Sequence, residues 1–154
     1  ADYASAVGIA FRPGARPWQM PIDIALPCAT QNELGREDAQ RLVANKVACV
    51  AEGANMPCTP EAVGIFREAG VLFVPGKASN AGGVATSGLE MTQNAQRLPW
   101  TRQQVDAHLK EIMQSIHRSC VRHGERDGRV DYVDGANVAA FVKVADAMMA
   151  QGVT

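Results

Sequence analysis

The side chains best suited to bind a ligand lie in Gly76–Asn94, where glycines, a lysine and asparagines occur close together. The apolar run Val71–Val74 precedes this segment and has the length of a strand, and the proline-free residues after it are typical of a helix. Asn80 is suited to cap that helix, and Gly82 and Gly83 leave room for a ligand or another backbone. Open α/β sheets bind ligands at such polar helix starts. The alternative is a structural turn in which helix and strand pack closely.

Short apolar runs elsewhere in the chain predict the elements that position this segment. We expect strands at Ile22–Leu26, Val47–Ala51 and Val71–Val74, because each run has strand length and ends in turn residues. Between them we expect one helix at Glu37–Asn45 and another that follows the capping residue Thr59 and stops before Gly70. This alternation predicts an α/β fold with a parallel sheet and right-handed crossovers.

Polar turns follow all three predicted strands. These turns are Cys28-Ala29-Thr30, Gly53-Ala54-Asn55 and Lys77 to Asn80. The carboxyl ends of parallel strands lie at one edge of a sheet, where open α/β proteins bind their ligands. The sequence therefore predicts a binding site at this edge.

The last third of the chain is predicted to be helical. Thr101 and Gln104 have the spacing of a capping box. A helical apolar stripe follows, formed by Val105, Leu109, Ile112, Met113, Ile116 and Cys120. After a charged loop at Gly124–Val130 we expect a final helix whose apolar residues, Met148 and Met149 included, fill a core. We expect the chain to divide into residues 1–98, which carry the sheet, and a helical segment, residues 99–154.

The composition indicates a globular protein and argues against several other classes. Apolar residues make up 47% of the chain and charged residues 20%. The net charge is −1 without a basic block, which removes the electrostatic basis for nucleic-acid binding. No apolar run approaches the roughly 18–20 residues of a membrane helix, and the amino end lacks the pattern of a signal peptide.

The spacing of cysteines and histidines does not predict a metal site. No C-x-x-C pair occurs among Cys28, Cys49, Cys58 and Cys120. We expect these thiols to be reduced, mostly buried and in the cytoplasm. The histidines lack the spacing of a ligand pair on a helix, and we expect them at the surface: His108, His117 and His123.

Known phosphate-binding fingerprints are missing. Five residues separate Gly70 from Gly76-Lys77, where a phosphate loop has four, and no Ser or Thr follows the lysine. Neither a G-x-G-x-x-G pattern nor a nucleophile elbow occurs. We expect any dinucleotide fingerprint, and the residue that selects NAD or NADP, to lie upstream.

Four long segments resemble signature stretches of hexameric glutamate dehydrogenases, in the order of that family. They are Pro21–Leu34, Cys49–Val63, Pro75–Arg97 and Tyr132–Val153, and they cover nearly the whole chain. Only the carboxyl-terminal part of such an enzyme is matched. The resemblance implies the second half of a Rossmann-like parallel sheet in residues 1–98, with about three strands and flanking helices but without the G-x-G-x-x-G half. The family's catalytic Lys and Asp belong to the amino-terminal part, so the resemblance places no catalytic residue in this chain.

The resemblance also implies binding roles. Asn80 matches the asparagine that holds the nicotinamide carboxamide. The groove for the adenosine and ribose portions matches Cys28, Ala29, Thr30 and Asn55. The family pattern differs at Ser79, where Ala is common, at Cys58, where Ser or Thr is usual, and at Gly35, which replaces a capping residue. None of these three differences falls on a proposed contact.

Two residues of the following helix match substrate contacts of the family. Val84 corresponds to a residue that packs against the substrate carbon chain, and Ser87 to one that bonds the substrate's side-chain carboxylate together with an upstream Lys. Such a carboxylate requires charge-assisted partners when it is buried. Val84 and Ser87 are three residues apart and therefore share one helix face. The alternative for Ser87 is a hydroxyl that bonds its own helix backbone.

The resemblance thus implies the coenzyme-domain portion of an enzyme that interconverts L-glutamate with 2-oxoglutarate and ammonia. It favours NADP over NAD, a cytoplasmic homo-hexamer, and a missing amino-terminal part of the same enzyme as partner. We expect the isolated chain to be inactive. The alternatives are a non-catalytic nucleotide-binding or assembly module, a remnant of a cleaved enzyme, or a dehydrogenase for another amino acid.

Overall fold

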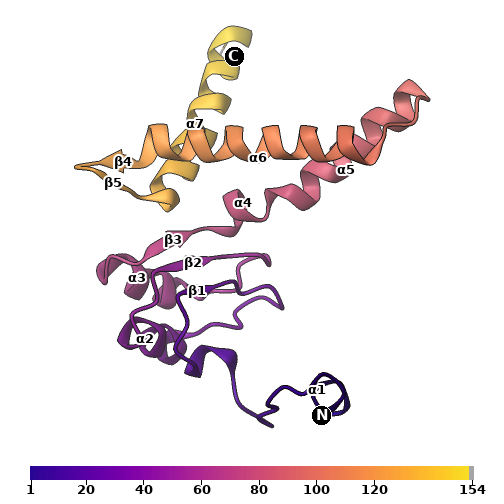
Figure 1. Ribbon diagram of the computed structural model, residues 1–154. Coiled ribbons are helices and arrows are strands. Elements are labelled where there is room, and N and C mark those ends of the chain that lie inside the picture. Colours follow the sequence, from indigo (N-terminus) through magenta and orange to yellow (C-terminus); the bar gives the residue numbers. More distant parts are fainter. Residues whose placement is uncertain (153–154) are drawn as a thin grey trace.

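The computed structural model describes residues 1–152 (Figure 1). Val153 and Thr154, the last two residues of the predicted segment 99–154, lie outside the described residues. The helices are α1 (Asp2–Val7), the 3-10 helix Pro17–Gln19, α2 (Arg36–Ala44), α3 (Pro60–Glu68), α4 (Gly76–Ser79), α5 (Ala81–Gln96), α6 (Arg102–Gly124) and α7 (Tyr132–Gln151). The strands are β1 (Ile24–Ala25), β2 (Cys49–Ala51), β3 (Leu72–Val74), β4 (Glu125–Arg126) and β5 (Arg129–Val130).

Strands β1, β2 and β3 form a parallel sheet in chain order, as the alternating pattern predicts. Each crossover contains one helix, α2 between β1 and β2 and α3 between β2 and β3. The strands are short, and only two residues of the predicted strand Ile22–Leu26 pair in the ladder. The α/β fold class is confirmed.

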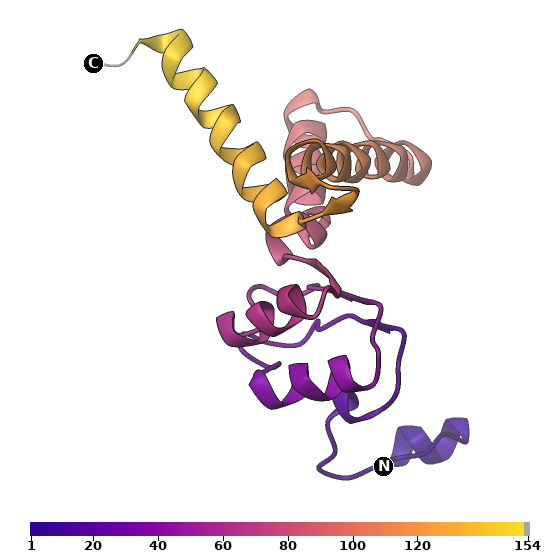
Figure 2. The same ribbon diagram turned by 90° about the vertical axis from the view of Figure 1, so that its left-hand side faces the viewer.

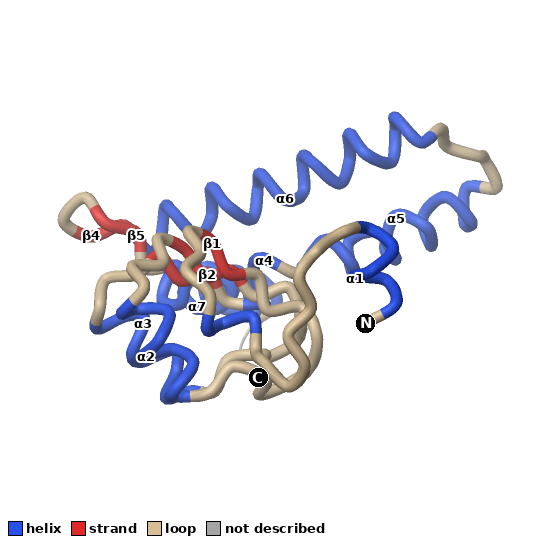
Figure 3. The backbone as a smooth tube through the Cα atoms, turned by 60° about the horizontal axis from the view of Figure 1, so that its bottom comes forward, coloured by secondary structure: helices blue, strands red, loops and turns tan. Residues whose placement is uncertain are grey.

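One face of this sheet is buried and the other is largely bare. Ala25, Val50 and Phe73 are aligned across the three strands, and they form one core with α2 and α3. These two helices lie side by side (Figure 3). On the opposite face, Ile24 is 60% exposed and Leu72 is 44% exposed. Parallel sheets are normally covered on both faces, so the described chain provides only one of the two layers.

Two of the capping residues predicted from sequence, Thr59 and Thr101, are confirmed. The Thr59 hydroxyl accepts a hydrogen bond from the N–H of Ala62 at 3.3 Å, and α3 begins at the next residue. Thr101 and Gln104 form the reciprocal bonds of a capping box at the start of α6. No helix of residues 1–152 has the length and apolar character needed to span a membrane.

Helices α6 and α7 meet at two glycines. A Cβ atom on Gly135 would overlap the carbonyl oxygen of Cys120, and one on Gly124 would overlap the carbonyl oxygen of Asp131. The missing side chains let the two backbones approach closely. Beyond this crossing, α7 projects away from the other elements (Figure 2).

Two expectations about the carboxyl-terminal part are wrong. Met148 and Met149 do not fill a core: they are 53% and 77% exposed, because no described element reaches the outer half of α7. The predicted loop Gly124–Val130 contains an antiparallel hairpin, β4 paired with β5. Its turn residues Asp127 and Gly128 both have positive φ, which is the conformation that a two-residue Asp-Gly hairpin turn requires.

Candidate functional site

The turns after β1 and β2 lie against each other. The carbonyl oxygen of Pro27 accepts from the backbone N–H groups of Gly53 at 2.9 Å and Ala54 at 3.1 Å. Gly53 lies so close to Cys28 that a Cβ at this position would overlap the sulfur atom. Any side chain here would require the Cys28 side chain to move. The hydrogen bonds to Pro27 hold the first two polar turns together at one edge of the sheet.

Glu52, the first residue after β2, joins the second turn to the third. Its side chain is buried, with Oε2 accepting from the N–H of Gly76 at 2.7 Å and Oε1 from the N–H of Cys58 at 3.2 Å. The Ser79 hydroxyl donates to the Glu52 carbonyl oxygen at 2.6 Å. The sequence pattern assigned no role to Glu52, which directly follows the predicted strand Val47–Ala51. An acidic residue directly after a buried apolar strand is the pattern that could have drawn attention to it.

Asn80 occupies the capping position of α5, but the prediction that its side chain caps that helix is wrong. The amide nitrogen donates instead to the carbonyl oxygen of Ala54 at 3.0 Å and to the side-chain oxygen of Asn55 at 2.8 Å. The helical turn α4 ends at Ser79, and the next residue, Asn80, directs its side chain across the edge toward the second turn. The structure thus brings together Asn55 and Asn80, two residues predicted to bind the cofactor.

A cavity of about 290 Å³ opens at this edge. It is lined by Glu52, Asn55, Met56, Pro75, Gly76, Lys77 and Asn80. Both amide hydrogens of Asn80 are used within the protein, which leaves its side-chain oxygen to accept and the Asn55 amide nitrogen to donate. A donor and an acceptor side by side suit a carboxamide or another planar polar group. Lys77 donates to Asn137 of α7 at 2.5 Å and so links this edge to the helical segment.

The other predicted site residues lie outside this cavity. Cys28, Ala29 and Thr30 are exposed at the neighbouring turn, where the N–H of Ala29 donates to Glu33 at 2.8 Å. Val84 is 75% exposed on α5. Ser87 is also exposed, and its hydroxyl donates to the carbonyl oxygen of Gly83 in its own helix at 3.4 Å. The roles of these residues stay predictions.

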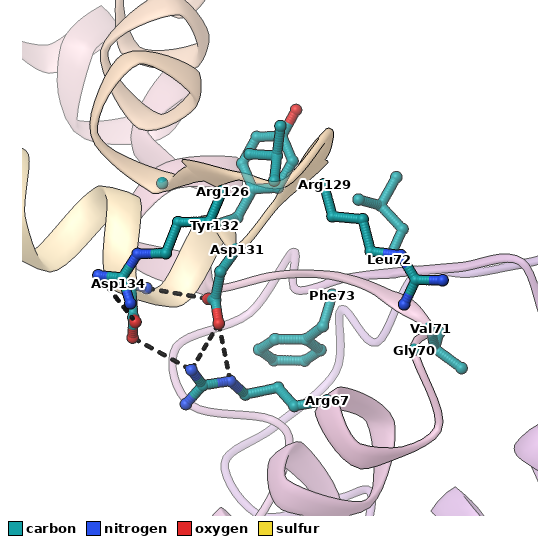
Figure 4. A pocket seen from close by; sticks show the side chains of 12 residues that line it. Arg67, Gly70, Val71, Leu72, Phe73, Arg126, Arg129, Asp131, Tyr132 and Asp134 are labelled. Atoms are coloured by element: carbon teal, nitrogen blue, oxygen red, sulfur yellow. Dashed lines mark hydrogen bonds and ion pairs between the residues drawn. The ribbon is translucent and has the colours of Figure 1, made fainter.

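A larger hollow of about 600 Å³ lies between β3, the β4–β5 hairpin and the start of α7 (Figure 4). Its charged groups are largely paired with one another. Arg67 of α3 donates to Asp131 through Nε at 3.1 Å and to Asp134 at 3.1 Å. Asp131 also caps α7 by accepting from the N–H groups of Val133 and Asp134. The ion pairs around this hollow thus form a joint that connects the sheet-bearing part of the chain to the helical segment.

The electrostatics of Asp131 follow from these contacts. Partial burial alone would raise the pKa of this carboxyl. The hydrogen bond from the Asp134 N–H, the bond and charge of Arg67 and the bond from the Val133 N–H outweigh burial and hold the pKa below its usual range. Asp131 is therefore an ionised cap at neutral pH.

The thiols offer no reactive group inside the core. Burial, reinforced by the nearby Glu52 carboxylate, raises the pKa of Cys58, and burial also raises the pKa of Cys49 and Cys120. All four cysteines are free, with Cys28 exposed. Residues 1–152 contain no group of three or more metal-ligating side chains placed to hold a metal ion.

Three parallel strands with one helix in each crossover, and polar turns that meet at one edge of the sheet, give this chain the architecture of an open α/β fold. Over residues 1–152 it matches the profile of the Glutamate/Leucine/Phenylalanine/Valine dehydrogenase family, and it belongs to that family.

Individual relatives agree with this assignment. The chain is 62% identical over 153 residues to the NADP-specific glutamate dehydrogenase of Escherichia coli (strain K12), an alignment that covers 99% of this chain and 34% of the relative. A solved glutamate dehydrogenase structure superposes with a TM-score of 0.93 at 46% identity, covering 99% of this chain and 34% of that one. The Plasmodium falciparum glutamate dehydrogenase gives a TM-score of 0.93 at 42% identity, with coverage of 99% and 33%. The chain thus spans about a third of the length of these relatives.

Proposed function

We propose that this chain is the coenzyme-binding portion of an NADP-dependent glutamate dehydrogenase, which interconverts L-glutamate with 2-oxoglutarate and ammonia. The observation that carries the proposal is the Asn55–Asn80 amide pair at the edge where the three polar turns converge. Residues 1–98 form a partial dinucleotide-binding domain, and residues 99–154 a helical segment that packs back on it. The chemistry of hydride transfer belongs to the nicotinamide, and this chain's residues bind and orient it.

The proposed cofactor contacts lie on all three polar turns. The Asn80 side-chain oxygen binds the nicotinamide carboxamide, the Asn55 amide nitrogen binds ribose, and Cys28, Ala29 and Thr30 line the groove for the adenosine portion. NADP is proposed over NAD because relatives at 62% identity are named NADP-specific. The residue that selects the 2′-phosphate, like the catalytic Lys and Asp, is supplied from outside this chain.

The substrate contacts are proposed on α5. Val84 packs against the carbon chain of glutamate, and Ser87 exchanges its bond to the Gly83 carbonyl for one to the substrate's side-chain carboxylate. Both residues are exposed in the described chain. They can enclose a substrate only when another part of the protein covers this face of α5.

Uncovered surface supports a working unit larger than this chain. The accessible surface is 10761 Å², against about 7,500 Å² for a compact globular protein of this length. Within residues 1–152, no layer covers the second face of the sheet, the free edge of β1 or the outer half of α7. We propose that the chain functions within a longer cytoplasmic polypeptide that assembles as a homo-hexamer, and that it is inactive alone.

The test measures glutamate-dependent NADPH formation by two samples, the 154-residue chain and the longer polypeptide that contains it, each with its intact mass determined. We expect activity only in the longer polypeptide. There, Ser87→Ala should raise the KM for glutamate at least about tenfold, as expected when a charged group loses a hydrogen bond.

Thr92→Ala is the matched control, because Thr92 is an exposed hydroxyl on the same helix and also bonds its own backbone, at 2.9 Å. It should leave the KM unchanged. A longer polypeptide without glutamate-dependent activity would contradict the proposed function. Activity with an unchanged glutamate KM in Ser87→Ala would favour another amino acid as substrate.

A further inference from the structure

We infer that Glu52 is a positioning residue for the cofactor site: its buried carboxylate holds the second and third turns together so that Asn55 and Asn80 face the cavity. The inference rests on the proposed function and names a residue to which the resemblance assigns no role. Glu52 acts through the two asparagines, since both of its carboxylate oxygens are already engaged by backbone N–H groups.

The burial of Glu52 is hard to explain by stability alone. The residue is only 6% exposed, and none of the ion pairs among residues 1–152 includes it. A buried carboxylate is tolerated only with good hydrogen-bond donors, and well-packed apolar residues often stabilise a protein better than buried charge. What a carboxylate supplies, and an apolar side chain does not, is a link with two acceptor atoms.

That link reaches both turns that carry the asparagines. Oε1 accepts from the N–H of Cys58, which closes the loop that contains Asn55. Oε2 accepts from the N–H of Gly76, the first residue of the helical turn that ends before Asn80. A displacement of the Glu52 carboxylate would therefore change the distance between the side-chain amides of Asn55 and Asn80.

The packing around Gly76 leaves little freedom for such a displacement. A Cβ built on Gly76 would lie 3.0 Å from the carbonyl oxygen of Ala54, and 3.3 Å from both the Asn80 amide nitrogen and Glu52 Oε2. The hydrogen bond from Ser79 to the Glu52 carbonyl oxygen fastens the same turn from its other end. The spacing of the two amides is thus set by Glu52 and the backbone that it binds.

The decisive variant is Glu52→Gln in the longer polypeptide. Glutamine has the same shape, but one acceptor oxygen becomes an NH₂ group, which cannot accept from either backbone N–H. We expect the KM for NADP to rise about tenfold or more, and kcat at saturating NADP to fall less than about threefold. Glu68→Gln is the matched control, since Glu68 is exposed near the end of α3, and it should leave both values unchanged.

A double variant separates positioning from general stability. If Glu52 acts through Asn80, the rise in KM caused by Glu52→Gln should shrink when Asn80 is already alanine, because residues of one network are not additive. A KM within about twofold of wild type, or full additivity with Asn80→Ala, would overturn the inference. A wild-type protein that forms no NADPH from glutamate would instead contradict the proposed function.

Should Glu52→Gln fail to fold, Glu52→Asp carries the same test. Aspartate keeps the charge but is one methylene too short to reach both N–H groups. The KM for NADP should rise in this variant too, and an unchanged KM would overturn the inference.

Discussion

The sheet-bearing part and the helical segment of this chain reach their structures in different ways. In the sheet-bearing part, eleven buried residues form one continuous core that includes both crossover helices. In the helical segment, α6 has only Cys120 and Gly124 buried, and α7 has only Gly135. Helix α5, which leads from the sheet toward this segment, has no buried residue. The difference shows that strong local helix patterns do not by themselves create a core.

Different interactions therefore hold the two regions. The sheet-bearing part is stabilised by apolar burial, as the stacked rings of Phe66 and Phe73, 5.9 Å apart, illustrate. The helical segment depends on capping, the close glycine crossing of α6 and α7, and the Arg67 ion pairs that fasten α7 to α3. The helical segment exposes apolar side chains that another layer of protein would bury.

The largest expected effect compares two phenylalanines. Phe66→Ala should lower the free energy of unfolding by about 3–5 kcal/mol, because Phe66 is fully buried and its removal leaves a cavity. Phe141→Ala in α7 should change it by less than about 0.5 kcal/mol, since Phe141 is 72% exposed. Urea denaturation of the 154-residue chain measures both. Equal effects would contradict the contrast between the regions, and a larger Phe141 effect in the longer polypeptide would show that α7 is covered there.

The next effect concerns the glycine crossing. Gly135→Ala should destabilise the chain by about 1–3 kcal/mol, because the added methyl overlaps the Cys120 carbonyl and forces α6 and α7 apart. Gly88→Ala is the matched control, since Gly88 lies within α5 with open space around its Cβ position, and it should be stabilising by up to about 1 kcal/mol. Thermal unfolding of both variants checks the pair. Equal shifts of the midpoint would mean that the crossing is not tightly packed.

The smallest effect tests the joint between the regions. Asp131→Ala should lower the free energy of unfolding by about 1–2 kcal/mol at pH 7, by removing the α7 cap and the partner of Arg67. Asp131 has a folded-state pKa below its unfolded value, so its stabilisation is complete above the ordinary aspartate pKa of about 4 and is lost as the pH falls through the folded value.

The difference in thermal unfolding midpoint between wild type and Asp131→Ala should therefore be smaller at pH 3 than at pH 7. Asp106→Ala is the control, because Asp106 is an exposed carboxylate on α6, and its effect should be near zero at both pH values. A difference for Asp131 that stays constant with pH would mean that its charge contributes nothing to the joint.

Short-range patterns in the sequence determined much of this structure. Strand-length apolar runs predicted the three parallel strands, and hydroxyl residues at the right offset predicted the caps at Thr59 and Thr101. These features depend on neighbours within about four residues, which is the range of helix capping and helical periodicity. The Asp127-Gly128 hairpin belongs to the same class, and the sequence carried its pattern although the prediction treated the segment as a loop.

Only the tertiary structure decided how the edge of the sheet is built. Asn80 was predicted to cap its own helix, yet its amide bonds Asn55, 25 residues away. The sequence pattern assigned no role to Glu52, yet its buried carboxylate accepts from the N–H of Gly76, 24 residues away. Side chains such as those of Asn80 and Glu52 can hydrogen-bond either a group nearby in the sequence or a distant group that the parallel strands bring close. Sequence spacing describes the first alternative, and the folded sheet supplies the second.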